Sequence, residues 1–162
     1  MRSECTTPMT SVRLTIHTDH ALRMLMLLAL ESEPLHTIED IARRYNISHS
    51  HLMKIAQTLV RAGFIESVRG RHGGLRLGCG AKSINLGAVV RATEDNFRLV
   101  ECFNQQRNVC VISPACRLRG PLEEALQAFL GVLDRYCLDD LVNSAETSRR
   151  MSRLLGTLDT TE

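Results

Sequence analysis

The chain has 162 residues, of which 44% are hydrophobic, and its formal net charge is +2. Four Phe, two Tyr and no Trp leave the core to aliphatic side chains, which favours helices over a sandwich of strands. The longest apolar run, residues 24–30, is far shorter than the roughly 20 residues of a membrane-spanning helix, and no signal-peptide cleavage pattern follows it, so we expect a cytoplasmic protein that does not bind membranes.

The charge is unevenly distributed. Residues 37–78 carry seven Arg or Lys against three Asp or Glu, whereas the rest of the chain carries 13 basic and 15 acidic residues. A polyanion such as DNA would therefore be bound by this middle segment.

Two helices are predicted in the first third of the chain. The first begins near Thr18, a good N-cap, and has Asp19 in its first turn, where the helix dipole favours a carboxylate. The second begins at Thr37-Ile-Glu-Asp40, a relative of the capping box, and ends at Tyr45. Its shortness is typical of the first helix of a helix-turn-helix pair.

A tight turn and a recognition helix follow. Asn46 suits a left-handed turn, Ser48 caps the next helix, and Gly63 ends it. The N-terminal end of this helix is predicted to face outward, as in helix-turn-helix proteins that read base edges. We expect His51 to influence sequence preference, within a group of DNA contacts that comprises Ser48, His49, Ser50, His51 and Lys54.

A β-hairpin wing is predicted after the recognition helix. Residues 64–69 alternate like a strand, residues 70–74 form a glycine-rich turn, and residues 75–77 return as a second strand. The slim glycine backbone lets cations approach phosphates or enter a minor groove. The expected contacts on the wing are Arg69, Arg71, His72 and Arg76.

Further helices are predicted in the second half. One covers residues 83–94, and a long apolar stripe runs from Leu118 to Tyr136. A small winged domain does not need so long an apolar face, so we interpret the stripe as a dimerisation helix; the alternative is that it folds back on its own domain. A short helical turn is predicted over residues 138–142.

Three cysteines lie close together as Cys102-x7-Cys110-x5-Cys116. In a reducing compartment such a cluster favours metal binding over disulfides, although three ordinary buried thiols remain the alternative. The gaps do not form the paired knuckles of zinc sites, so an iron-sulfur cluster is preferred over structural zinc. Three thiolates are one short of four ligands. The fourth must come from elsewhere in the protein or from solvent.

These motifs together resemble the iron-sulfur winged-helix repressors over roughly residues 12–142. The matching strings are Leu14-Thr15, Thr18-Asp19, Ala21-Leu22-Arg23, Ser48-x-x-His51-Leu52-Met53-Lys54-Ile55, Arg61-Ala62-Gly63, Val68-Arg69-Gly70-x-x-Gly73-Gly74-x-Arg76-Leu77, Val100-Glu101-Cys102 and Cys110-Val-Ile-Ser-Pro-Ala-Cys116-Arg117-Leu118. The last of these is the most specific.

The resemblance implies a homodimer that binds an inverted-repeat operator in double-stranded DNA and is not an enzyme. It further implies that Cys102, Cys110 and Cys116 hold an iron-sulfur cluster, with 4Fe-4S favoured over 2Fe-2S. In the nitric-oxide-sensing members, an aspartate of the partner subunit completes the coordination, and the matching position is Asp19. Arg23 matches an arginine that supports that site. Nitric oxide is then the expected signal, and damage to the cluster releases the DNA.

Other branches and classes remain as alternatives. Members that regulate iron-sulfur biogenesis have a histidine where this chain has Arg119, which argues against that type of site. An iron-responsive repressor is the close competitor, because Thr93-Glu94-Asp95-x-Phe97 and Glu101-Cys102-Phe103 resemble that branch. An iron-sulfur electron-transfer protein is the alternative from another class, and it leaves the winged segment unexplained.

The expected architecture is mainly α with a small β-hairpin wing, that is, a winged helix-turn-helix domain plus a long dimerisation helix. The predicted parts are a flexible leader (residues 1–12), a DNA-binding domain (13–94), a cluster-binding loop (95–117), a dimerisation helix region (118–142) and a disordered tail (143–162).

Overall fold

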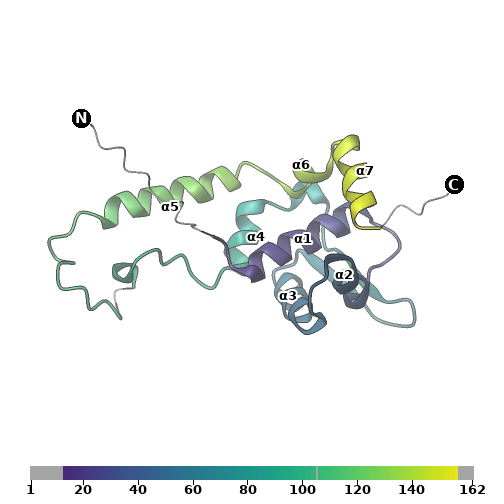
Figure 1. Ribbon diagram of the computed structural model, residues 1–162, viewed down its shortest axis with the longest axis horizontal. Helices are drawn as coiled ribbons and strands as arrows, with labels where there is room; N and C mark the ends of the chain where they lie inside the picture. Colours follow the sequence, from purple (N-terminus) through teal and green to yellow (C-terminus); the bar gives the residue numbers. More distant parts are fainter. Residues whose placement is uncertain (1–12, 105, 157–162) are drawn as a thin grey trace, which may run out of the picture.

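The computed structural model describes residues 13–104 and 106–156, so the predicted leader lies outside the described residues. Figure 1 shows a body of packed helices with a hairpin, from which one long helix and the preceding loop extend together to one side. The elements are α1 (Ile16–Leu30), α2 (Ile38–Tyr45), α3 (His49–Arg61), β1 (Ile65–Val68), β2 (Gly74–Leu77), η1 (Ala81–Ser83), α4 (Leu86–Thr93), η2 (Glu101–Phe103), α5 (Arg119–Leu133), α6 (Leu138–Val142) and α7 (Ala145–Leu154).

Helix α1 begins earlier than predicted. Its N-cap is Thr15, whose hydroxyl accepts a hydrogen bond from the Thr18 amide, while Thr18 itself is fully buried. The prediction of Thr18 as the cap was therefore wrong, because Thr15 caps the helix three residues earlier and Thr18 supplies the amide that donates to it. Asp19 does lie in the first turn, as predicted.

The helix-turn-helix is confirmed. Thr37 caps α2 by accepting from the Asp40 amide at 3.1 Å, and Asn46 adopts the left-handed conformation at φ 53°. Gly63 follows α3 at φ 79°, a conformation that glycine adopts without strain.

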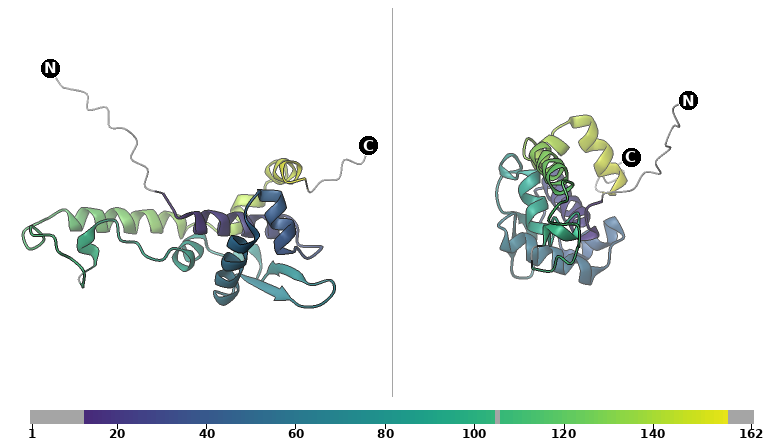
Figure 2. Two further views of the ribbon diagram at one scale, coloured as in Figure 1. Left: turned by 60° about the horizontal axis from the view of Figure 1, so that its bottom comes forward. Right: turned by 90° about the vertical axis from the view of Figure 1, so that its left-hand side faces the viewer.

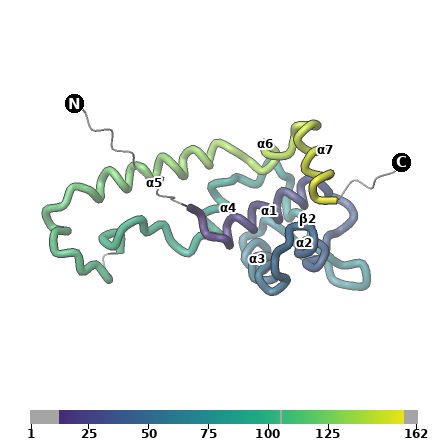
Figure 3. The backbone as a smooth tube through the Cα atoms, in the orientation of Figure 1, coloured from purple at the N-terminus to yellow at the C-terminus, as the bar shows by residue number. Residues whose placement is uncertain are grey.

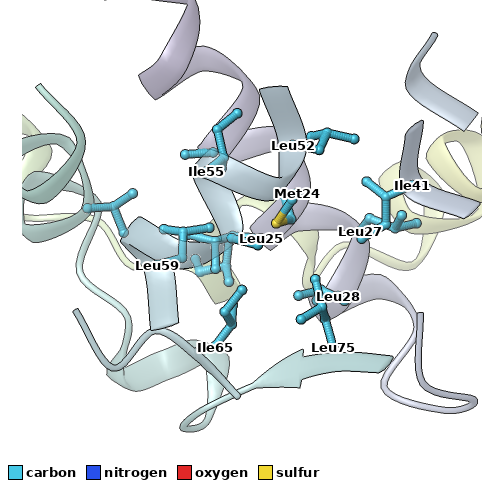
Figure 4. Packing of buried hydrophobic residues seen from close by; sticks show 14 of the residues in the cluster. Met24, Leu25, Leu27, Leu28, Ile41, Leu52, Ile55, Leu59, Ile65 and Leu75 are labelled. Atoms are coloured by element: carbon cyan, nitrogen blue, oxygen red, sulfur yellow. The ribbon is translucent and has the colours of Figure 1, made fainter. Parts of the chain in front are cut away.

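The core forms around α1, which is buried along one face. Figure 4 shows side chains from α1, α3 and the hairpin pointing toward one another around Met24. Each fully buried aliphatic side chain contributes about 1.5–3 kcal/mol to the free energy of unfolding. The labelled members of this core are Met24, Leu25, Leu27, Leu28, Ile41, Leu52, Ile55, Leu59, Ile65 and Leu75.

The predicted wing is confirmed as an antiparallel hairpin with Ile65 opposite Leu77 and Val68 opposite Gly74. Figure 2 shows the hairpin loop projecting from the body beyond the end of α2. Leu75 also exchanges two backbone hydrogen bonds with His36, at 2.8 and 3.3 Å, which ties the hairpin to the segment that follows α1. A side chain at position 74 would meet the His36 carbonyl oxygen at 2.9 Å, so glycine is required there.

Helix α5 leaves much of its apolar face uncovered within one chain. Only Leu130 is buried in it, while Phe129 and Val132 are 42% and 44% exposed. Its C-terminal end is fixed to α4 because Asp134 accepts from both terminal nitrogens of Arg91, at 2.6 and 2.7 Å. The predicted short helix is present as α6.

The predicted disordered tail was wrong over residues 145–154, which form α7. Ser144 caps this helix by accepting from the Thr147 amide, and Leu155 packs against the core at its end. A polar sequence therefore folds here because its end is anchored by tertiary contact. In the described parts of the chain, no helix is long and apolar enough to cross a membrane.

Candidate DNA interface and cysteine loop

The outer face of α3 differs from the predicted one. His49, Ser50 and Lys54 are exposed as expected, and the exposed surface continues through Gln57 and Arg61, which lie beyond the predicted contacts. Those two residues lie one and two turns beyond Lys54, so extending the 3.6-residue period would have found them. Ser48 is exposed and makes no cap hydrogen bond with its side chain.

His51 is half-buried, and its ring is turned toward α1 and not outward as predicted. Its predicted influence on base preference stays a prediction. Its ring lies edge-on to the rings of His17 and His20 on α1, at centroid distances of 5.9 and 5.1 Å. Its Nε2 is buried and has no hydrogen-bond partner among the described residues. The ring faces α1 because consecutive helical residues are about 100° apart, which places His51 next to Leu52 on the side of α3 that packs against α1.

The histidine contact affects the neighbouring rings. Burial, followed by the charge of His51, lowers the pKa of both His17 and His20 from its usual value. The neutral form of these rings is therefore favoured between α1 and α3.

The wing presents its cations at the turn. Arg69, Arg71 and His72 are all exposed there, and Gly70 has φ 115°. Arg76 lies differently, because its Nη2 is 2.9 Å from a carboxylate oxygen of Glu66 on the paired strand. Strand alternation places this pair on the opposite face of the hairpin from Leu75, which is buried in the hydrophobic core.

A polar network joins α2 to the end of α1 and to the segment that follows it. His36 is 3% exposed, with Nδ1 3.3 Å from Asp40 and Nε2 3.0 Å from the Glu31 carbonyl oxygen. Arg44 contacts Glu31 at 3.1 Å and Asp40 at 2.8 Å. Burial raises the pKa of Asp40, but hydrogen bonds from Arg44, Arg43 and His36 outweigh burial and hold it below the usual value.

The cysteine loop is held by local hydrogen bonds. Cys102, Cys110 and Cys116 are free thiols of intermediate burial. The Leu118 amide donates to Cys116 Sγ at 3.4 Å, and the Val109 amide donates to the Glu101 carboxylate at 2.7 Å. Amide donors to sulfur are typical of the surroundings of iron-sulfur clusters.

The three cysteines suit a cluster by their chemistry, although they are not gathered around a point. Among the residues that the structure describes, no three His, Cys, Asp or Glu side chains are arranged to hold a metal ion. Figure 3 shows the loop turning at the far end of α5, away from α1 of the same chain. The three thiolates can therefore hold a cluster only if the loop closes around it. A fourth ligand must then come from outside the loop.

Asp19 is paired within its own helix. Its two carboxylate oxygens accept from Arg23 Nη2 at 2.6 Å and from Nε at 3.2 Å. The side chains are 47% and 43% exposed, respectively, so both remain accessible to another molecule.

A groove separates α5 from the start of α1. It has a volume of about 700 Å³ and is lined by residues 13–15, residues 94–99 and the apolar face of α5, including Leu122, Leu126 and Phe129. Glu94 closes one side by accepting from the Thr15 amide at 2.8 Å.

A helix-turn-helix followed by a cationic hairpin defines a winged-helix DNA-binding protein. Residues 14–144 match the model of the Rrf2 family, described as an iron-dependent transcriptional regulator. The chain therefore belongs to the Rrf2 family of transcriptional regulators.

Similar proteins support the same assignment. The regulator NsrR of Bacillus subtilis is 48% identical over 144 residues, covering 88% of this chain and 99% of the relative. NsrR of Geobacillus kaustophilus is 49% identical over 141 residues, covering 86% and 96%. These similarities confirm the predicted resemblance to iron-sulfur winged-helix repressors, and among them to NsrR.

Solved structures confirm the predicted fold. T. potens IscR superposes with a TM-score of 0.66 at 22% identity, covering 86% of this chain and 92% of that one. The oxidised form of Staphylococcus aureus CymR gives 0.64 at 25% identity, covering 82% and 98%.

Proposed function

We propose that this regulator is a cytoplasmic, non-enzymatic repressor that senses nitric oxide through an iron-sulfur cluster, with 4Fe-4S favoured over 2Fe-2S. Cys102, Cys110 and Cys116 hold the cluster, and Asp19 of the partner subunit completes its coordination. The observation that carries the proposal is the loop of three free thiols on a winged-helix chain similar to proteins named NsrR.

The proposal requires a homodimer, for which the exposed face of α5 is the main support. Phe129 and Val132 are large apolar side chains left more than 40% exposed, and the adjoining groove of about 700 Å³ is apolar along α5. A two-fold dimer would cover both and would present two recognition helices to an inverted repeat.

Asp19 and Arg23 link the signal to the fold. When bound, the cluster would supply iron that reacts with nitric oxide. In the DNA-binding state, Asp19 reaches the partner's loop and Arg23 remains beside it. In the released state, Asp19 returns to the bidentate pairing with Arg23 seen in this structure. The position of α1, and of α3 packed against it, differs between the two states.

An iron-responsive repressor is the second candidate. It is favoured by the description of the family as iron-dependent and uses the same three cysteines. The two candidates differ in signal, because an iron-responsive repressor releases DNA on iron chelation and ignores nitric oxide.

The cluster is tested by anaerobic purification followed by visible absorbance and metal analysis. We expect iron, sulfide and visible absorbance, all lost in Cys110→Ser. Cys79→Ser is the matched control, because Cys79 is an exposed thiol outside the loop, and it should keep the absorbance. A colourless protein that contains zinc contradicts the proposal, as does a reversible redox centre in a chain that binds no DNA.

A further inference from the structure

A continuous line of exposed side chains runs along α3. Ser50, Lys54, Gln57 and Arg61 follow one another at spacings of four, three and four, and all four are exposed. The opposite side of the helix is buried, and His51 is turned toward α1. The face of α3 that is free to enter a major groove is therefore centred on Lys54 and Gln57.

A hollow lies beside this line, between α3 and the wing. Its volume is about 510 Å³, and Figure 2 shows the hairpin next to α3, on the side away from α5. The lining includes Met53, Gln57, Val60 and Arg61 of α3 and Ser67 and Leu75 of the hairpin. No carboxylate lines it, because Glu66 is paired with Arg76 on the other face.

Gln57 belongs both to the line of exposed side chains on α3 and to the lining of the hollow, and its side chain ends in an amide group. It is exposed, and within residues 13–104 and 106–156 its side chain makes no hydrogen bond. A glutamine amide can both donate to and accept from an adenine edge, which makes it a good reader of A·T pairs. Met53, 43% exposed beside it, is an apolar surface suited to the thymine methyl group.

The surrounding charges point to a nucleic acid as the occupant. Lys54 and Arg61 flank Gln57 on the same face, and Arg69 and Arg71 extend the positive surface along the wing. These cations would hold phosphates on both sides of the base that Gln57 meets.

We propose that Gln57 is the specificity-determining residue of α3, selecting an A·T pair in each half-site, with Met53 against the thymine methyl and Lys54 and Arg61 on the phosphates. This inference deepens the proposed function, since it rests on operator binding by the dimer. It does not depend on which signal releases the DNA.

The test is selection from a library of randomised DNA duplexes by the full-length protein. Wild type is expected to enrich an A·T pair at one position of each half-site. Gln57→Ala should lower that preference by about 5- to 150-fold while leaving other positions unchanged. Gln57→Glu, which accepts from the cytosine amino group, should shift the preference toward C·G.

Lys54→Ala is the contrasting variant, expected to weaken binding to all sequences alike and to leave the selected bases unchanged. Identical base preferences in wild type and Gln57→Ala would overturn the inference, as would retention of adenine by Gln57→Glu. A wild-type protein that selects sequences but ignores nitric oxide contradicts the proposed signal alone. The comparison between variants then still decides the role of Gln57.

Discussion

The imidazole ring of His51 on α3 meets the ring of His20 on α1 edge-on, with centroids 5.1 Å apart and planes at 78°. His20 follows Asp19, the ligand that we propose for the partner's cluster. The recognition helix is thus in contact with the helix that would carry the signal. Such a contact couples two sites if its geometry differs between their two states.

His51→Ala should therefore reduce the effect of the cluster on DNA affinity without altering base preference. Removing a half-buried ring also lowers the free energy of unfolding by about 1–2 kcal/mol. The measurement is the ratio of operator affinities of cluster-loaded and cluster-free protein. His49→Ala, an exposed neighbour in the same helical turn, is the control and should keep the wild-type ratio. A changed base preference in His51→Ala would show that the side chain faces DNA after all.

Arg71→Ala and Arg76→Ala separate the two faces of the wing. Arg71 lies exposed at the turn, so its loss should reduce the slope of log affinity against log salt by about one unit per subunit, or about two units for the proposed dimer. Arg76 is already paired with Glu66 and should change the slope little. Titrations of operator DNA at several salt concentrations measure both slopes. If Arg76→Ala reduced the slope more than Arg71→Ala, the face of the wing that carries Arg76 would be the one that contacts DNA.

The Asp40 network predicts a loss of stability in acid. The pKa of Asp40 is lower in the folded chain than its unfolded value of about 3.9, so its contribution is present above that value and is lost as pH falls through the folded pKa. Asp40→Asn should be less stable than wild type at neutral pH, and the difference should narrow below about pH 4. Urea unfolding across this range measures it. A difference in free energy of unfolding that stayed constant at every pH would contradict a contribution from ionised Asp40.

Phe129→Glu should convert the proposed dimer to a monomer. The ring lines the groove beside α5 and is 42% exposed, and a carboxylate at its position would be desolvated in a dimer interface. Sedimentation velocity gives the mass of each form. The control is Glu123→Gln, an exposed change on the same helix, which should remain dimeric. A Phe129→Glu protein that stays dimeric would place the interface elsewhere.

Much of the fold follows from local signals in the sequence. The caps at Thr37 and Ser144, the left-handed Asn46 and the glycine after α3 act within a few residues of themselves. Of the two caps, Thr37 was predicted from the sequence. Ser144 and α7 were not predicted, because α7 is held by the packing of Leu155 against residues far away in the chain.

The candidate site is less predictable. Periodicity identified the buried stripe of α3, but the angle at which α1 packs against it decides that His51 turns inward and Gln57 outward. The pairing of Arg76 with Glu66 depends on strand register. The cysteines were found by their type and spacing, whereas the proposed fourth ligand would belong to a second copy of the chain, whose placement no single sequence specifies.

The most direct test is an anaerobic titration of the cluster-loaded protein with nitric oxide, following visible absorbance and operator binding in the same sample. We predict that the absorbance changes and the operator is released together, and that Asp19→Asn alters this response while Glu39→Gln, an acidic first-turn residue of α2, does not. A protein that holds operator DNA with unchanged affinity at every nitric oxide concentration would contradict the account.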